Sequence, residues 1–177
     1  MTGFKPVCML IVISLLAGGC ASGTKRDTSN VDTAYVLSQD QQIGSVAIAL
    51  TPEAKKQSVE NLKFDAEELR KHVERALEVS ELLNEPDKGK LPGVIIEVKE
   101  IRVRSNFTAV MFGFMAGADS ITGDIVIQDP AGSELDRFEV SVDYALGGLA
   151  GGQDTARVSW LYEKFAEETI NELKGQR

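Results

Sequence analysis

The 177-residue chain has few of the side chains on which most protein chemistry depends. Its two cysteines, Cys8 and Cys20, both lie in the first 20 residues, so the rest of the chain has no thiol for a disulfide, a metal–thiolate site or a nucleophile. Its single histidine, His72, is not part of any Ser/His/Asp or metal-ligand pattern, and we interpret it as a surface or boundary residue. We therefore expect no enzymatic activity, no cofactor and no metal.

The chain also lacks an excess of basic residues. Lys and Arg total 19 against 27 Asp and Glu, which gives a net charge of −8. Nucleic-acid binding needs clustered Lys and Arg that neutralise phosphates, and the sequence has no such cluster. We therefore expect no nucleic-acid partner. The 43% of hydrophobic and 26% of charged residues are typical of a globular domain.

No apolar run is long enough to span a bilayer. The longest, Val7–Leu16, has ten residues, whereas a spanning helix needs about 20. Lys5 precedes this run, and Ala-Gly-Gly and then Cys20 follow it, which is typical of an export signal. The order also resembles the bacterial lipobox, in which cleavage precedes the cysteine and its sulfur receives a lipid. Leu16 lies four residues before Cys20 instead of the usual three, and an ordinary secretory signal is the alternative.

We thus expect a signal peptide over residues 1–19 and an acylated Cys20 that holds the protein in a lipid bilayer, because two or three acyl chains anchor durably. Ala21 and Ser22 follow the cysteine instead of Asp. By resemblance to enterobacterial sorting, this favours the outer membrane of the cell envelope, facing the periplasm. Residues 20–42 are mostly polar and predict a flexible tether, in which the apolar tripeptide at 35–37 is a candidate to dock on the domain.

The remaining residues, 43–177, predict a single domain. Strands are expected at 45–50, 94–104, 120–128 and 134–144, from alternating apolar residues. Apolar residues at spacings of three and four predict an amphipathic helix over 59–83 and a last helix capped by Asp154 or Thr155. The strand at 94–104 changes phase, which predicts a β-bulge near Lys99-Glu100.

This order of elements, β-α-β-β-β-α, predicts an α+β fold. The first two strands are joined through a helix, so they should be parallel, and the last three should form an antiparallel meander. We expect a two-layer sandwich in which two helices cover one face of a mixed four-stranded sheet.

Two further patterns have structural interpretations. The helical acids Glu67, Glu68, Glu163, Glu167 and Glu168 lie among Lys and Arg, and we expect them to form ion pairs on solvated faces. The glycine-rich segment 147–152 precedes a helix but lacks the Lys-Ser/Thr ending of a phosphate-binding loop, so we expect a simple connection.

The segment Phe107–Ala118 is unusual because it joins two strands and is nevertheless almost entirely apolar. One interpretation is that it packs under the sheet or over an open edge. The other is an exposed loop that contacts a protein partner or dips into a bilayer, with Phe112, Phe114 and Met115 as the candidate contact residues.

The stretch from Gly93 to Gly152 resembles the bacterial lipoprotein family known as domain of unknown function 4410. The resemblance is carried by the strand GVIIEVKEIRVR, the apolar loop, the hairpin GDIVIQDPAGSELDRFEV and the segment GGLAGG. It implies a fold and a location but no catalytic residues. We expect a membrane-anchored envelope lipoprotein that binds or scaffolds a protein partner, within an export or cell-surface assembly. The alternative is a small-ligand binder or an enzyme with a cryptic site, which a deep pocket with convergent polar groups would favour.

Overall fold

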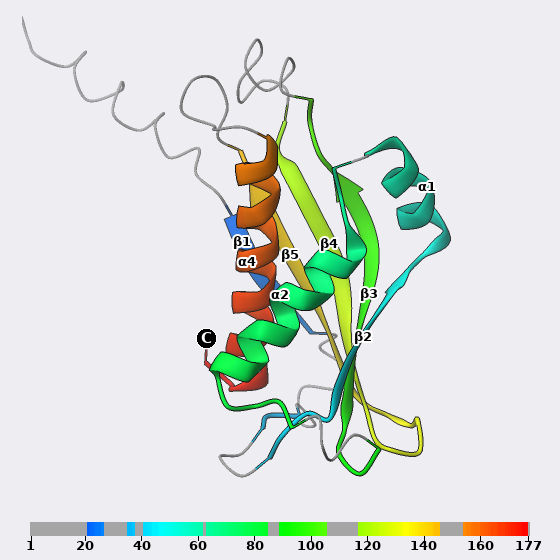
Figure 1. Cartoon of the computed structure of the whole chain (residues 1–177), viewed down its shortest axis with the longest axis vertical. Helices are drawn as coiled ribbons and strands as arrows, with labels where there is room; N and C mark the ends of the chain where they lie inside the picture. Colours follow the sequence, from blue (N-terminus) through cyan, green and yellow to red (C-terminus); the bar gives the residue numbers. More distant parts are fainter. Residues whose placement is uncertain are drawn as a thin grey trace, which may run out of the picture.

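The computed structural model describes residues 21–26, 35–37, 41–61, 63–84, 89–105, 117–145 and 154–176. Within these ranges the protein is α+β, with one mixed, open sheet and helices packed on it (Figure 1). The strands are β1 (Ala21–Lys25), β2 (Ser45–Leu50), β3 (Gly93–Arg102), β4 (Asp119–Gln128) and β5 (Glu134–Tyr144). The helices are α1 (Pro52–Glu60), α2 (Ala66–Val79) and α4 (Asp154–Leu173).

The sheet has the order β1-β5-β4-β3-β2. The pairing of β2 with β3 is parallel, and β3, β4 and β5 form the antiparallel meander that the sequence predicts. The predicted β-bulge is confirmed, because the register of β3 against β4 shifts between Val98 and Glu100. This bulge returns Ile101 to the buried face that Val98 also occupies.

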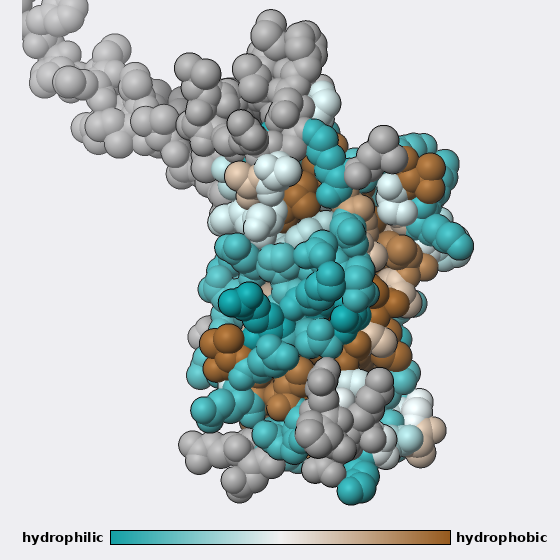
Figure 2. All heavy atoms as spheres, viewed as in Figure 1, coloured by the Kyte–Doolittle hydropathy of each residue, from teal (hydrophilic) through white to brown (hydrophobic). Residues whose placement is uncertain are grey.

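The core lies between the sheet and the two long helices. In Figure 1, α2 and α4 cross the same face of the sheet, as the sequence predicts. The outer side of this helical layer is mostly hydrophilic, whereas hydrophobic residues gather beside it, along β2 (Figure 2). The fully buried side chains that fill the layer include Leu69, Leu77, Ile96, Ile121, Ile125, Phe138, Leu161 and Phe165.

The opposite face of the sheet is polar. Asp124 of β4 accepts hydrogen bonds from Lys99 of β3, at 2.8 Å, and from Arg137 of β5, at 3.1 Å. Lys99 also pairs with Glu139, and Arg137 with Glu97. The antiparallel meander is thus buried on one side and laced with ion pairs on the other.

The predicted number of four strands is wrong, because β1 adds a fifth strand within the segment expected to be a tether. β1 pairs antiparallel with β5 from Ala21↔Asp143 to Lys25↔Glu139. The side chains that β1 directs toward α4 are polar: Ser22 and Thr24 donate hydrogen bonds to Glu168 and Glu172. The strand therefore lacks the hydrophobic alternation by which a strand is predicted. Further along, Leu37 is buried and its N–H donates to the carbonyl of Leu173, so the apolar tripeptide does dock.

The helix predicted over 59–83 begins later, at Ala66, because Asp65 caps it by accepting from the N–H groups of Glu67 and Glu68. A separate short helix, α1, precedes it. Its N-cap is Thr51 with Pro52 in the first turn, directly after the strand at 45–50. No helix in the described part of the chain is long and apolar enough to cross a membrane.

Helix α1 covers the edge of β3 where β2 no longer reaches it. β2 ends at Leu50, opposite Val98. Beyond this point the N–H of Ile101 donates to Oε1 of Gln57, and the N–H of Val103 donates to Oδ1 of Asn61. Side-chain amides thus replace the missing strand and satisfy backbone groups that an edge would expose.

Candidate functional site

Most of the residues that the sequence analysis selected for function lie outside the described part of the chain. These are Cys20, Phe112, Phe114, Met115 and the glycine-rich segment 147–152. His72 is described: it is half-buried on α2, its Nδ1 lies 2.8 Å from the carbonyl oxygen of Glu68, and its ring contacts Tyr162. This placement agrees with a boundary histidine that packs on an aromatic ring.

The strands bring the described residues that flank several of these segments to one end of the sheet. Ala21 lies opposite Asp143, Asp119 lies opposite Tyr144, and Arg102 lies opposite Ser120. We call the end of the sheet formed by Ala21, Arg102, Asp119 and Tyr144 the anchor end. It is the upper end in Figure 1, and the segments 106–116 and 146–153 join the described chain there.

A buried ionic cluster lies immediately beneath the anchor end. Asp119 is 0% exposed and receives hydrogen bonds from two arginines that are also buried. Its Oδ1 accepts from the backbone N–H of Arg104 at 2.6 Å and from Nε of Arg104 at 3.1 Å. Its Oδ2 accepts from Nε of Arg157, in the first turns of α4, at 2.7 Å. One carboxylate therefore joins the end of β3, the start of β4 and the start of α4.

The two guanidinium groups also bind carbonyl oxygens where the flanking segments leave the sheet. Arg104 donates from Nη1 to Gly117, at 2.5 Å, and from Nη2 to Tyr144, at 3.1 Å. Arg157 donates from Nη2 to the carbonyl of Arg104, at 2.9 Å. Arg104, which precedes the apolar segment, and Gly117, near its end, are thus fixed by charge-assisted hydrogen bonds. Because Arg104 and Arg157 donate hydrogen bonds to these carbonyl oxygens, the cluster is suited to positioning the segments that leave the sheet here.

The sequence does not identify this cluster directly, although the position of Arg157 points to it. Arg157 stands directly before Val158 and four residues before Leu161, on the apolar side of the last helix. A charge on a buried helix face is rare unless it is paired, so its position predicts a buried partner. Nothing in the local pattern identifies Asp119 as that partner, because the contact spans 38 positions of the chain.

A second ionic cluster attaches β1 to the domain. Arg26, directly after β1, pairs with Asp136 of β5, and its Nε lies 2.6 Å from Glu172 of α4. Its guanidinium also lies over the ring of Phe138, 5.0 Å from the centroid. Burial alone would lower the pKa of Arg26, but the hydrogen bonds to Asp136 and Glu172 outweigh it and raise this pKa above its ordinary value. Arg26 therefore stays charged and clamps the N-terminal strand between β5 and α4.

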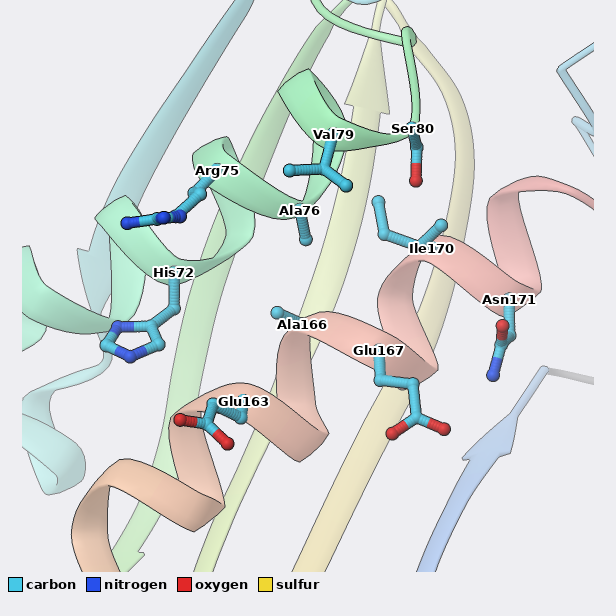
Figure 3. A pocket seen from close by; sticks show the side chains of 10 residues that line it. All are labelled: His72, Arg75, Ala76, Val79, Ser80, Glu163, Ala166, Glu167, Ile170 and Asn171. Carbon is cyan, nitrogen blue, oxygen red and sulfur yellow. The ribbon is translucent and has the colours of Figure 1, made fainter. Parts of the chain in front are cut away.

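A groove of about 490 Å³ runs between α2 and α4. In Figure 3 its small and apolar side chains, such as Ala76, Ala166 and Ile170, lie between the helices, whereas the charged Arg75 and Glu167 do not point toward each other. The groove thus has an apolar floor and a charged rim. Polar side chains from both helices, among them His72, Glu163 and Asn171, also line it.

Four of the five helical acids form the ion pairs that the sequence predicts, whereas Glu163 accepts a hydrogen bond from the hydroxyl of Ser159. Glu67 pairs with Arg70, Glu68 with Lys71, and Glu167 with Lys164. Among the described residues, no group of three or more His, Cys, Asp or Glu side chains could hold a metal ion.

Comparison with known proteins identifies the fold and the family. The solved structures that resemble this chain include a PelC variant dodecamer from Paraburkholderia phytofirmans, with a TM-score of 0.50 and 9% identity over 85% of this chain and 96% of that one. A second PelC dodecamer from the same organism gives a TM-score of 0.46 and 10% identity, over 82% of this chain and 98% of that one. No curated protein matches the sequence. The family model described as domain of unknown function (DUF4410) matches residues 26–148, more than half of the chain, and the protein belongs to this family.

Proposed function

We propose that this protein is a lipid-anchored lipoprotein of the bacterial envelope whose domain scaffolds a protein assembly without catalysing a reaction. The observation that carries the proposal is the position of Ala21, the first residue of β1, directly after the candidate lipidation residue Cys20. An acyl group on Cys20 would be attached to the folded sheet itself. Such an attachment suits a protein that must hold a fixed position on a membrane.

The organisation of the domain supports a scaffolding role. Its buried charges, Asp119 with two arginines and Arg26 with two acids, hold together distant segments of the chain. The small-ligand alternative would use the groove between α2 and α4, which has both apolar and polar lining residues.

Lipidation is tested by metabolic labelling with a fatty acid. Wild-type protein should incorporate the label and fractionate with membranes. Cys20→Ser should incorporate none, and should either be released from membranes or accumulate as the unprocessed precursor. Cys8→Ser, in the apolar run, is the matched control and should behave as wild type. Equal labelling of wild type and Cys20→Ser would refute the proposal.

The partner is sought by crosslinking the intact lipoprotein in its envelope and capturing it. The double substitution Phe112→Ser with Phe114→Ser distinguishes the two interpretations of the apolar segment. If these residues and Met115 form the contact surface, the partner should be lost while the melting temperature barely changes. If they are core, the domain should lose several kcal/mol of stability. His72→Ala should leave both properties unchanged.

Self-assembly is a second candidate, favoured by the exposed edge of β2. Its sequence, SVAIAL, has no charged residue, Ala47 and Ala49 are exposed, and Ile48 and Leu50 are half-buried. Edge strands usually carry charges or proline that prevent pairing with another chain. The two PelC structures are dodecamers by their titles, and we propose that this chain also associates with copies of itself.

If the chain self-associates through β2, the double substitution Ala47→Lys with Ala49→Lys should convert an oligomer to a monomer. The molar mass is measured by light scattering after gel filtration. Ala131→Lys, in the exposed turn between β4 and β5, is the control and should not change the mass. A wild-type protein that is monomeric at micromolar concentration would refute self-assembly and leave the lipoprotein proposal standing.

A further inference from the structure

We infer that the anchor end of the domain faces the bilayer surface and is held there in a fixed orientation. This inference rests on the proposed acylation of Cys20 and names the surface that the membrane contacts. It differs from the arrangement expected from the sequence, in which a flexible tether would separate the domain from the lipid.

The connection between Cys20 and the sheet is short. Ala21 is already hydrogen-bonded into the sheet as the partner of Asp143, so no flexible residue intervenes between Cys20 and the sheet. One residue spans at most about 3.6 Å of chain. The acylated residue would therefore lie within one residue's length of Ala21, the first residue of β1, and the sheet would begin at the level of the lipid headgroups.

β1 is attached rigidly to the rest of the domain. β1 is bound on one side to β5 by backbone pairing and, on the face toward α4, to that helix by side chains. Ser22 donates to Glu168 at 2.7 Å, Thr24 donates to Glu172 at 2.8 Å, and Arg26 completes the clamp. Because the strand cannot detach without breaking these contacts, the domain cannot swing freely about its anchor.

The direction of β1 determines which end of the sheet lies near the lipid. β1 runs antiparallel to β5, so Ala21 lies beside the C-terminal end of β5, and the turn at residues 129–133 lies at the opposite end of the sheet. At 3.3 Å per residue, the length of β4 places these two ends about 30 Å apart. The chain therefore presents the anchor end to the lipid and directs the turn away from it.

The surface chemistry of the anchor end fits a lipid interface. Tyr144 is half-buried there and its ring lies 5.2 Å from that of Trp160, and such rings favour the headgroup region. Val59, near the end of the adjacent helix α1, is 72% exposed. These features are explained together if the anchor end lies against the bilayer.

The test uses the full-length lipoprotein, in which an introduced cysteine would be the only free thiol, since Cys8 is removed with the signal and Cys20 is acylated. Thr155→Cys places a fluorescent label in the first turn of α4, at the anchor end, and Ala131→Cys places it in the opposite turn; both positions are exposed. The labelled proteins are reconstituted in vesicles of phosphatidylethanolamine and phosphatidylglycerol that contain a nitroxide-headgroup lipid. We expect the Thr155→Cys label to be quenched several-fold more strongly than the Ala131→Cys label.

Equal quenching at the two sites, or stronger quenching at Ala131→Cys, would overturn the inference. A matched variant carries a flexible Gly/Ser insertion of about 15 residues between Cys20 and Ala21 and should abolish the difference while leaving acylation intact. The protein without an added cysteine distinguishes a wrong orientation from a failure of the proposed function. If that protein takes up the thiol label, Cys20 is free, and both the lipoprotein proposal and the orientation are wrong.

Discussion

Arg157, near the start of α4, donates a 2.7 Å hydrogen bond from Nε to the carboxylate of Asp119, the first residue of β4. Both side chains are withdrawn from solvent, with 1% and 0% of their surface exposed. Arg104 binds both oxygens of the same carboxylate, from Nε to Oδ1 at 3.1 Å and from Nη2 to Oδ2 at 3.2 Å. Two positive groups thus bind one carboxylate inside the fold, and each guanidinium also donates to neighbouring carbonyl oxygens.

Replacement of the shared carboxylate should be strongly destabilising. Asp119→Asn keeps the size of the side chain but removes the negative charge of the carboxylate that both buried guanidinium groups bind. Removing one partner of a buried ion pair typically costs about 3–5 kcal/mol, because the remaining charge stays desolvated. Urea denaturation should therefore show a loss of that order.

The control for Asp119→Asn is Glu67→Gln, which removes a carboxylate from an ion pair with Arg70 on the solvated face of α2. Exposed pairs contribute about 0–1 kcal/mol, so its denaturation midpoint should stay close to that of wild type. If Asp119→Asn were as mild as this control, the cluster would have no structural importance.

The clamp on β1 makes a separate prediction. Glu172→Gln weakens the acceptor that binds Thr24 and Arg26 at once, and hydrogen bonds to charged groups contribute about 1.5–3 kcal/mol. Amide exchange of residues 21–25 should accelerate, while exchange in the central strand β4 should change much less. Glu163→Gln, on the exposed side of the same helix, should leave the exchange of β1 unchanged. Unaltered protection of β1 in Glu172→Gln would show that backbone pairing alone retains the strand.

The parts of the fold that the sequence predicted are those stabilised by apolar burial. The alternation in β4 and β5 and the change of phase in β3 follow directly from which side chains enter the core, so the meander and its bulge were recoverable. β1 was not, because its inward-facing side chains bind two glutamates of α4 instead of apolar groups. α1 was missed for a similar reason: Ala54 is its one buried residue, so the helix has no apolar periodicity.

The anchor end could not be assembled from the sequence for a geometric reason. Its components come from positions around 21, 104, 119, 144 and 157, and only the register of the strands brings them together. The sequence did identify the two segments of interest, the lipidation signal and the apolar stretch. The described residues that flank these two segments meet at one end of the sheet because β1 runs antiparallel to β5, which no local pattern predicts.

Gly123 of β4 lies close to the backbone of β3 beside the bulge, so a substitution there tests the register of the two strands. A Cβ added to Gly123 would lie 3.0 Å from the carbonyl oxygen of Glu97 and 3.3 Å from Cα of Val98, and both are backbone atoms that cannot rotate away. Gly123→Ala should therefore destabilise the domain by about 1–3 kcal/mol, as overpacking does. Gly23→Ala, in β1, meets no atom within 4 Å and is the matched control, for which we expect almost no change in the melting temperature. An equal effect of the two substitutions would contradict the register at the bulge.

Tyr162 should make the stability of the domain fall in alkaline solution. Burial between α2 and α4 disfavours its phenolate and raises the pKa of Tyr162 to about 12, and the opposing hydrogen bond from the N–H of Asp65 is the smaller effect. Because the folded-state pKa lies above the unfolded value of about 10, the stabilising contribution is complete below pH 10 and is lost as the pH rises toward 12. At pH 11 the loss attributable to this group is about 1.4 kcal/mol. Tyr162→Phe cannot ionise, so the difference in unfolding free energy between wild type and variant should shift by that amount between pH 9 and pH 11. Parallel stability profiles for the two proteins over this range would contradict the assignment, since the other titrating groups are common to both.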